Sequence, residues 1–284
     1  MQAEPFEWPA SGGTLRGLCW RPGEAPRGNL LAVHGWLDNA ASFSLLGPSL
    51  ARAGWCVWAV DLPGHGQSDW LPAGAGYALA DYIPPLLEGV THQRGASWYY
   101  LGHSLGAVIG MLALVAAPGT FVRAVWIDAL GPMTTPPGQT ADQFRKAIHH
   151  RLQPVPETLR EYASLEEAAR HRASRFSPSD MSAARIIMAR SLVRKGNVWQ
   201  LRADPRVNWP STFRLCEAQI QEMLEAIACP VTVIGARQGL VKKPGPRMGW
   251  LSQGNFVSLS GGHHLHMENT ALEAVTNEVV KAFA

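Results

Sequence analysis

The sequence predicts an α/β fold in which a mostly parallel, eight-stranded sheet is flanked by helices. Short apolar runs alternate along the chain with longer amphipathic stretches, a pattern typical of strand–helix–strand units. The apolar runs are rich in Val, Ile, Leu and aromatic residues, as expected of strands buried on both faces. Hydrophobic residues make up 46% of the 284 residues, which is enough for a large core.

The expected elements follow one another in a regular order. Residues 1–20 predict an antiparallel edge pair that turns at Gly12 and Gly13. Core strands are expected at residues 29–33, 55–60, 98–101, 124–127, 231–234 and 256–259. Helices are expected at residues 44–53, 79–90, 105–116 and 271–283. Gly54 and Pro118 follow two of these helices, where such residues commonly end a helix.

Residues 131–209 interrupt this alternation. The stretch is rich in Ala, Arg, Glu and Leu, is punctuated by prolines, and shows no clear strand. We expect several short helices here, forming a cap that is inserted into a core of residues 1–130 and 210–284. Surface helices packed on the sheet without a lid role are the alternative interpretation.

Composition excludes several classes of protein. The net charge is only +3 and no run of five basic residues occurs, so a nucleic-acid partner is not expected. The four cysteines show no CxxC spacing. The N-terminus lacks the pattern of a signal peptide, and no apolar run is long enough to span a membrane. We therefore expect a cytoplasmic monomer or homodimer with no membrane partner.

The segment from Gly102 to Gly106 carries the strongest chemical signal. It reads GHSLG, which fits the G-x-S-x-G pattern between an apolar run and a helix-forming run. The two glycines keep Cβ atoms away from a tight strand-to-helix turn, so that the Ser104 hydroxyl projects as a nucleophile. The free N–H groups of the new helix face the same point. The alternative is an ordinary turn with an incidental serine.

An attacking serine turns a carbonyl into an oxyanion, which needs two preorganised hydrogen-bond donors. One expected donor is the main-chain N–H of Leu105, directly after the nucleophile. The other is expected in the loop His34-Gly35-Trp36, with the N–H of Trp36 as donor. His34 is interpreted as a structural histidine that braces this loop.

Four motifs together carry a resemblance to a known family. They are the HGW turn, the DLPGHGQSD segment, the GHSLG turn and the late GGHHLHMEN segment. In this order and spacing they resemble the α/β-hydrolase superfamily over roughly residues 10–130 and 225–284. The resemblance implies an α/β-hydrolase fold. HGWLDNAASF and VRKGNVWQLRADPRV are similar to the serine hydrolase-like protein subgroup of that superfamily.

The general base is expected at His263. The resemblance implies a G-H-x-x-H-x-E pattern whose first histidine is the base, and Gly262, His263, His266 and Glu268 fit it. His264 and His266 are interpreted as structural or pocket-lining. A histidine-rich metal site is the alternative, disfavoured because acidic or cysteine partners for such a site are not expected nearby.

The acid is expected at an unusual position. Many relatives carry an Asp after the strand that corresponds to residues 231–234, but residues 229–267 contain no Asp or Glu. Some relatives carry the acid one strand earlier, and there Asp128 directly follows the strand at 124–127. Pairing with His263 would satisfy its charge and fix the imidazole tautomer. Its alternative role is to cap the turn before Gly131. Asp61, which also ends a strand, is expected to be structural.

These residues predict a serine hydrolase. Ser104, His263 and Asp128 would transfer an acyl group to water through an acyl-enzyme, without metal or cofactor. A carboxylic ester is the broadest substrate class, with thioesters, lactones, amides and carbon–carbon bonds as further options. The alternative is a non-catalytic ligand- or partner-binding protein on a hydrolase fold, which the empty acid position after residues 231–234 favours.

Overall fold

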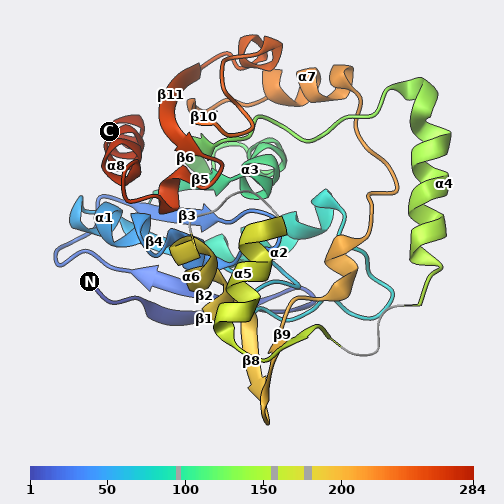
Figure 1. Cartoon of the computed structure of the whole chain (residues 1–284). Coiled ribbons are helices and arrows are strands. Elements are labelled where there is room, and N and C mark those ends of the chain that lie inside the picture. Colours follow the sequence, from blue (N-terminus) through green and yellow to red (C-terminus); the bar gives the residue numbers. More distant parts are fainter. Residues whose placement is uncertain (94–96, 155–158, 176–180) are drawn as a thin grey trace.

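A computed structural model of the chain describes residues 1–93, 97–154, 159–175 and 181–284. An eight-stranded sheet runs through it in the order β1-β2-β4-β3-β5-β6-β10-β11 (Figure 1). The pairs β1–β2 and β2–β4 are antiparallel and the other neighbours are parallel, which confirms the predicted sheet. Its strands are β1 (Glu4–Ala10), β2 (Gly13–Trp20), β3 (Asn29–Val33), β4 (Cys56–Val60), β5 (Trp98–His103), β6 (Phe121–Ile127), β10 (Val231–Gln238) and β11 (Gly254–Gly262).

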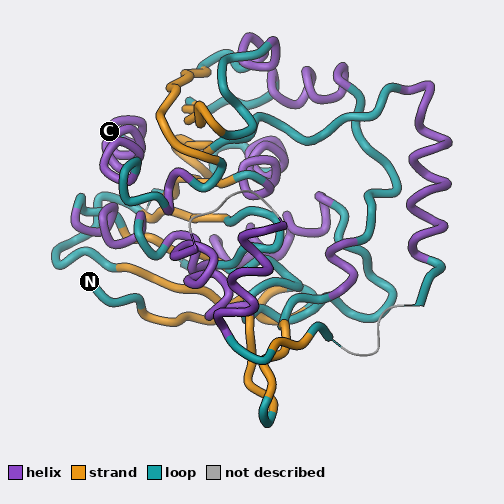
Figure 2. Tube along the Cα trace, in the orientation of Figure 1, coloured by secondary structure: helices purple, strands orange, loops and turns teal. Residues whose placement is uncertain are grey.

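Helices cover both faces of the sheet, as the tube in Figure 2 shows. One face packs against α2, α3 and α7 in a large apolar core. The other face packs against α1 and α8 in a second core. The bounds of these helices are α1 (Leu46–Arg52), α2 (Ile83–His92), α3 (Leu105–Ala116), α7 (Glu217–Glu225) and α8 (Leu272–Phe283). Short 3-10 turns occupy η1 (Ala40–Phe43), η2 (Leu79–Tyr82), η5 (Pro246–Trp250) and η6 (Leu265–Met267).

The helix expected at residues 79–90 begins later than predicted. Residues 79–82 form the 3-10 turn η2, and α2 starts only at Ile83. Pro84 and Pro85 explain the break, because proline lacks an N–H and fits best in the first helical turn. Apolar periodicity alone could not locate this change.

Several core strands are longer than expected, and their ends matter for the site. β5 continues through Gly102 to His103, and β6 ends at Ile127. Ser104 and Asp128 are therefore the first residues after two neighbouring parallel strands. The carboxyl ends of parallel strands meet at one edge of a sheet, where ligand sites are commonly built.

The segment between β6 and β10 departs from the prediction of short helices alone. It contains three strands that form a small separate sheet in the order β7-β9-β8. β8 and β9 form an antiparallel hairpin around Gly196, which has a φ of 59°, and Asn197. A two-residue Gly-Asn loop between two short strand-like runs is a hairpin signal, and it was missed. The elements are η3 (Pro137–Gln139), α4 (Thr140–Arg151), β7 (Glu161–Tyr162), α5 (Leu165–Arg175), α6 (Met181–Ser191), β8 (Leu192–Lys195), β9 (Val198–Leu201) and η4 (Pro205–Asn208).

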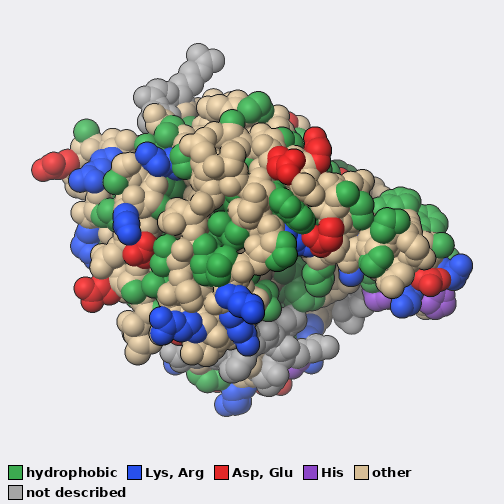
Figure 3. Space-filling view, turned by 90° about the horizontal axis from the view of Figure 1, so that it is seen from above, with side chains coloured by type: hydrophobic (Ala, Val, Ile, Leu, Met, Phe, Trp, Pro, Cys, Tyr) green, Lys and Arg blue, Asp and Glu red, His purple; other side chains and the backbone are tan. Residues whose placement is uncertain are grey.

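This segment is arranged in two parts. Helix α4 stands away from the sheet at the right of Figure 1, and only Ala147 of its residues is buried. From above, the same helix forms the projecting lobe in Figure 3, with His, Lys and Arg side chains near its end. Residues 155–158 and 176–180 of the predicted cap lie outside the described residues. Among the described residues no helix combines the length and apolar character needed to cross a membrane.

Buried polar contacts attach α5 and α6 to the core. Arg190 of α6 forms an ion pair with Asp61, whose side chain has no exposed surface. Asn39 donates its side-chain amide to the carbonyl of Ile187 at 2.8 Å. Arg172 of α5 forms a second buried ion pair, with Asp38. Because buried charges are costly unless paired, these contacts fix α5 and α6 against the loops that follow β3 and β4.

Candidate active site

Ser104 occupies a strained turn between β5 and α3. Its φ of 51° and ψ of −114° lie outside the regions that most residues adopt. The flanking glycines allow this turn. A Cβ atom at Gly102 would lie 2.6 Å from the main chain of Gly106, and one at Gly106 would lie 1.9 Å from the carbonyl oxygen of Val33. The turn is thus packed directly on the end of β3.

Gly106→Ala is expected to destabilise the fold by about 3 kcal/mol, because the added methyl group overlaps the Val33 carbonyl in a closely packed region. Gly138→Ala is the matched control, since a Cβ atom there meets nothing within 4 Å. Denaturant unfolding of both variants measures the difference. Equal stability of the two variants would contradict the close approach of α3 to β3.

Three predicted site residues meet at the carboxyl edge of the sheet. The Nε2 atom of His263 lies 2.9 Å from the Ser104 hydroxyl oxygen. Its Nδ1 atom lies 2.7 Å from the Asp128 carboxylate. Since an ionised carboxylate only accepts hydrogen bonds, Nδ1 carries the proton and Nε2 is free to accept the hydroxyl proton of Ser104. This arrangement suits general-base activation of a nucleophile.

The Asp128 carboxylate is completely buried in a cradle of hydrogen-bond donors. It accepts main-chain N–H groups from Ala236 at 3.1 Å, Leu240 at 2.7 Å and Val241 at 2.9 Å. Burial alone raises the pKa of Asp128, but these bonds and the one from His263 outweigh it, so the pKa lies below its usual value. Asp128 therefore stays ionised at neutral pH.

The loop after β10 packs directly against the Asp128 carboxylate. A Cβ atom at Gly239 would lie 2.1 Å from an oxygen of the Asp128 carboxylate. The loop in which relatives carry their acid instead wraps around Asp128 and donates N–H groups to it. Residues 229–267, which contain no Asp or Glu, therefore supply hydrogen-bond donors to Asp128.

Backbone strain is concentrated at this edge of the sheet. Among the described residues, the non-glycine residues with positive φ are Leu37 at 59°, Ser104 at 51° and Asp128 at 51°. They follow β3, β5 and β6, which are neighbours in the sheet. Strained residues persist only where surrounding structure holds them, and they cluster at functional sites.

The loop after β3 lies against the Ser104 turn. A Cβ atom at Gly35 would lie 3.0 Å from Nδ1 of His103, the residue before the nucleophile. His34 donates from Nδ1 to the carbonyl of Gly35 and accepts the N–H of Leu62 at Nε2, which braces the loop as expected. The Trp36 indole donates to the carbonyl of Val207 at 3.0 Å and is 43% exposed.

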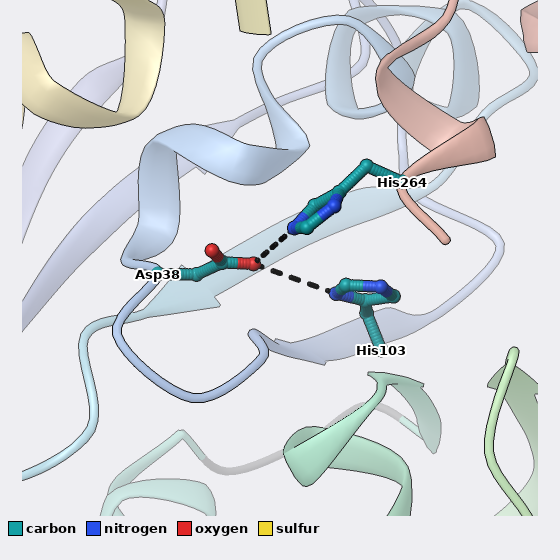
Figure 4. A group of neighbouring side chains, drawn as sticks. All are labelled: Asp38, His103 and His264. Atoms are coloured by element: carbon teal, nitrogen blue, oxygen red, sulfur yellow. Dashed lines mark hydrogen bonds and ion pairs between the residues drawn. The ribbon is translucent and has the colours of Figure 1, made fainter. Parts of the chain in front are cut away.

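The histidines near the site do have an acidic partner, contrary to the sequence-based expectation. Asp38, His103 and His264 have side-chain atoms within 4.8 Å of one another, and they are the group of described residues that could hold a metal ion (Figure 4). However, Arg172 already pairs with the Asp38 carboxylate. A divalent cation would add to this buried positive charge, so the group fits a hydrogen-bonding role better than a metal site.

Among the described residues, Asp61 makes no hydrogen bond to the three predicted site residues. Its carboxylate accepts the N–H groups of Ala40 at 2.7 Å and Gln67 at 2.8 Å, besides pairing with Arg190. Sequence reasoning missed Asp38 and Arg172. The position of Asp38 in the HGWLD turn was a usable signal, whereas nothing in the pattern around Arg172 distinguishes it from its neighbours.

Comparison with known proteins identifies the family of the chain. The family model described as alpha/beta hydrolase fold matches residues 28–212. The chain belongs to the α/β-hydrolase fold family. Within this family the hydrolase is 29% identical to a serine hydrolase-like protein of Dictyostelium discoideum, over 89% of this chain and 74% of the relative. It is 28% identical to a serine hydrolase-like protein of Danio rerio, over 98% of this chain and 87% of the relative.

Solved structures show the same relationship. A hypothetical protein of Pseudomonas aeruginosa PAO1 has a TM-score of 0.85 and 31% identity, covering 99% of this hydrolase and 98% of that chain. A thioesterase domain from the curacin biosynthetic pathway also has a TM-score of 0.85, with 19% identity, and covers 99% of this chain and all (100%) of that domain. At that identity the second likeness concerns the fold alone. The relatives' names support a hydrolase.

Proposed function

We propose that this protein is a serine hydrolase that cleaves a carboxylic ester or a related acyl substrate. Ser104 is the nucleophile, His263 the general base and Asp128 the acid that orients the base. The observation that carries the proposal is the continuous hydrogen-bonded chain from Ser104 through His263 to Asp128, with distances of 2.9 Å and 2.7 Å.

The mechanism follows from this chain. His263 removes the Ser104 proton as the oxygen attacks the carbonyl carbon, and the imidazolium that forms is stabilised by Asp128. The oxyanion is bound by the main-chain N–H groups of Leu105 and Trp36. Leu105 is the first residue of α3, so its N–H has no acceptor inside the helix. The imidazolium of His263 then protonates the leaving group as its bond to the carbonyl carbon breaks, which leaves Ser104 acylated. Water activated by His263 hydrolyses this acyl-enzyme and restores the Ser104 hydroxyl.

Residues 131–209 are proposed to act as the cap. Support comes from their contacts with the loop after β3, where Trp36 bonds to Val207 and Asp38 to Arg172. A cap anchored at this loop is proposed to border the space in front of Ser104. The expectations of a cytoplasmic monomer or homodimer that needs no metal or cofactor belong to the same proposal.

Fluorophosphonate labelling tests the proposal most directly. These reagents react with serine hydroxyl groups that an adjacent base activates, so the wild-type protein is expected to form one covalent adduct. Peptide mass spectrometry should locate the adduct on Ser104. Hydrolysis of short-chain p-nitrophenyl esters, measured on the same preparation, should be lost in proportion to the labelled fraction.

A folded protein that neither labels nor hydrolyses any ester would contradict the serine hydrolase proposal. That outcome would favour the alternative of a ligand- or partner-binding protein on this fold. Labelling at another serine would contradict the assignment of the nucleophile while leaving a hydrolase in place.

A further inference from the structure

Asp38 is a buried carboxylate that the mechanism above does not use. It is 2% exposed and lies in the loop after β3. One oxygen lies 3.2 Å from Nε2 of His264 and 3.5 Å from Nδ1 of His103, and Figure 4 shows this carboxylate facing both rings. The other oxygen accepts a hydrogen bond from Arg172 of α5.

Both histidines are chain neighbours of the proposed catalytic residues. His103 precedes Ser104, and His264 follows His263. The Nε2 atom of His103 lies 2.8 Å from the main-chain oxygen of His263, to which it donates. Asp38 therefore lies where a hydrogen bond joins the turn that carries Ser104 to the loop that carries His263.

Arg172 extends these contacts to the strained loop after β3. Besides pairing with Asp38, it donates to the carbonyl oxygen of Leu37 at 2.7 Å. Leu37 has a φ of 59° and follows Trp36, the proposed oxyanion donor. One guanidinium group on α5 thus holds both the carboxylate and the backbone of this loop.

The protonation state of His103 decides how its ring interacts with the Asp38 carboxylate. Because Nε2 donates to the His263 carbonyl, a neutral His103 ring turns an unprotonated Nδ1 toward the Asp38 carboxylate. Burial lowers the pKa of His103 to about 4, although Asp38 opposes this shift, so the ring is neutral at neutral pH. Arg172 offsets the resulting repulsion by pairing with the carboxylate. Titratable or charged groups that interact with Asp38 are His34, His65, His103, His264, His266 and Arg172.

We propose that Asp38 is a positioning residue that fixes Ser104 and His263 relative to each other and, through Arg172, makes their reactivity depend on the docking of α5. This inference rests on the proposed serine hydrolase function. Asp38 acts through His103 and His264 and does not contact the reacting atoms. A purely structural ion pair would stabilise the fold without changing how the rate depends on pH.

The test compares two buried ion pairs of the same kind. Asp38→Asn and Arg172→Met disrupt the pair next to the histidines. Asp61→Asn and Arg190→Met disrupt the pair that joins α6 to the core, and Asp61 makes no hydrogen bond to His103, His263 or His264 among those described. For all four variants, kcat/KM for an ester substrate is measured against pH, beside thermal unfolding.

The two charge changes near the histidines are expected to act in opposite directions. Removing the Asp38 anion disfavours protonation of the neighbouring histidines. The acid limb of the plot of kcat/KM against pH therefore moves to lower pH by about half a unit or more. Removing the Arg172 cation moves it to higher pH by a similar amount. Both variants lower kcat by about tenfold or more, because misplacing a base is costly. The Asp61 and Arg190 variants lose stability and keep the wild-type acid limb.

The proposal would be overturned if disrupting either ion pair shifted the acid limb equally. It would also be overturned if Asp38→Asn and Arg172→Met shifted the acid limb in the same direction. If Asp38→Asn does not fold, Arg172→Met against Arg190→Met gives the same comparison. Imidazole NMR signals of the four variants supply a readout that needs no activity. If the wild type proves inactive, altered titration of His103 and His264 only in the Asp38 and Arg172 variants would still support the coupling, and unaltered titration would overturn it.

Discussion

Replacement of Ser104 by Ala is expected to abolish fluorophosphonate labelling and to lower kcat for esters by about 10⁶-fold. The Ser104 hydroxyl oxygen lies 2.9 Å from Nε2 of His263, and the alanine variant has no hydroxyl group from which His263 could remove a proton. His263→Ala should fall to the same low rate, since a serine without its base is a poor nucleophile. Because the residues act as a unit, the double variant should be no slower than either single one. Labelling and ester hydrolysis of the purified variants measure these effects.

Ser42→Ala is the matched control for Ser104→Ala. The Ser42 hydroxyl is buried and has no hydrogen-bond partner among the described residues, so its removal tests the loss of a serine without loss of the nucleophile. Its labelling and kcat should remain close to those of wild type, and circular dichroism should show that both variants fold. Ester turnover by Ser104→Ala within tenfold of wild type would rule out this serine as the nucleophile.

The sheet was predictable because its strands carry strong local patterns. Runs such as residues 29–33 and 56–60 are completely buried, and their apolar composition marks them as central strands. The β8–β9 hairpin was not predicted, because its strands are only four residues long and partly exposed. Short, half-polar strands show little periodicity, and the Gly196–Asn197 turn was the one clear signal.

The three predicted triad residues come together because each directly follows a core strand, and the carboxyl ends of these strands lie at the same edge of the sheet. That rule needs only the order of strands and the polar residue after each one. The contact between Asp38 and Arg172 could not be found in this way, because it joins residues 134 positions apart. Local patterns carry no information on which buried carboxylate an arginine of an inserted helix will meet. The catalytic roles of the triad residues stay predictions.

Asp128→Asn is expected to lower kcat by on the order of 10⁴-fold while leaving the fold in place. The geometry dictates how an amide would sit. The carboxylate oxygen facing the N–H groups of Ala236 and Val241 must remain an acceptor, so the amide oxygen takes that place. The amide NH₂ group then faces Nδ1 of His263 and donates to it, while the N–H of Leu240, which bonds to the same carboxylate oxygen in the wild type, loses its acceptor. Nε2 would carry the imidazole proton, and His263 could no longer accept the proton of Ser104.

Asp61→Asn separates this tautomer effect from the loss of any buried carboxylate. Asp61 also ends a core strand, is equally buried and accepts two main-chain N–H groups, but it pairs with Arg190 and not with a histidine. Its variant should lose stability and keep kcat within about tenfold of wild type, as expected for a residue outside the triad. A similar rate loss in both variants would mean that buried charge, and not orientation of His263, controls activity. Full activity of Asp128→Asn would mean that the base is oriented by another group, and residues 229–267 offer no carboxylate for that role.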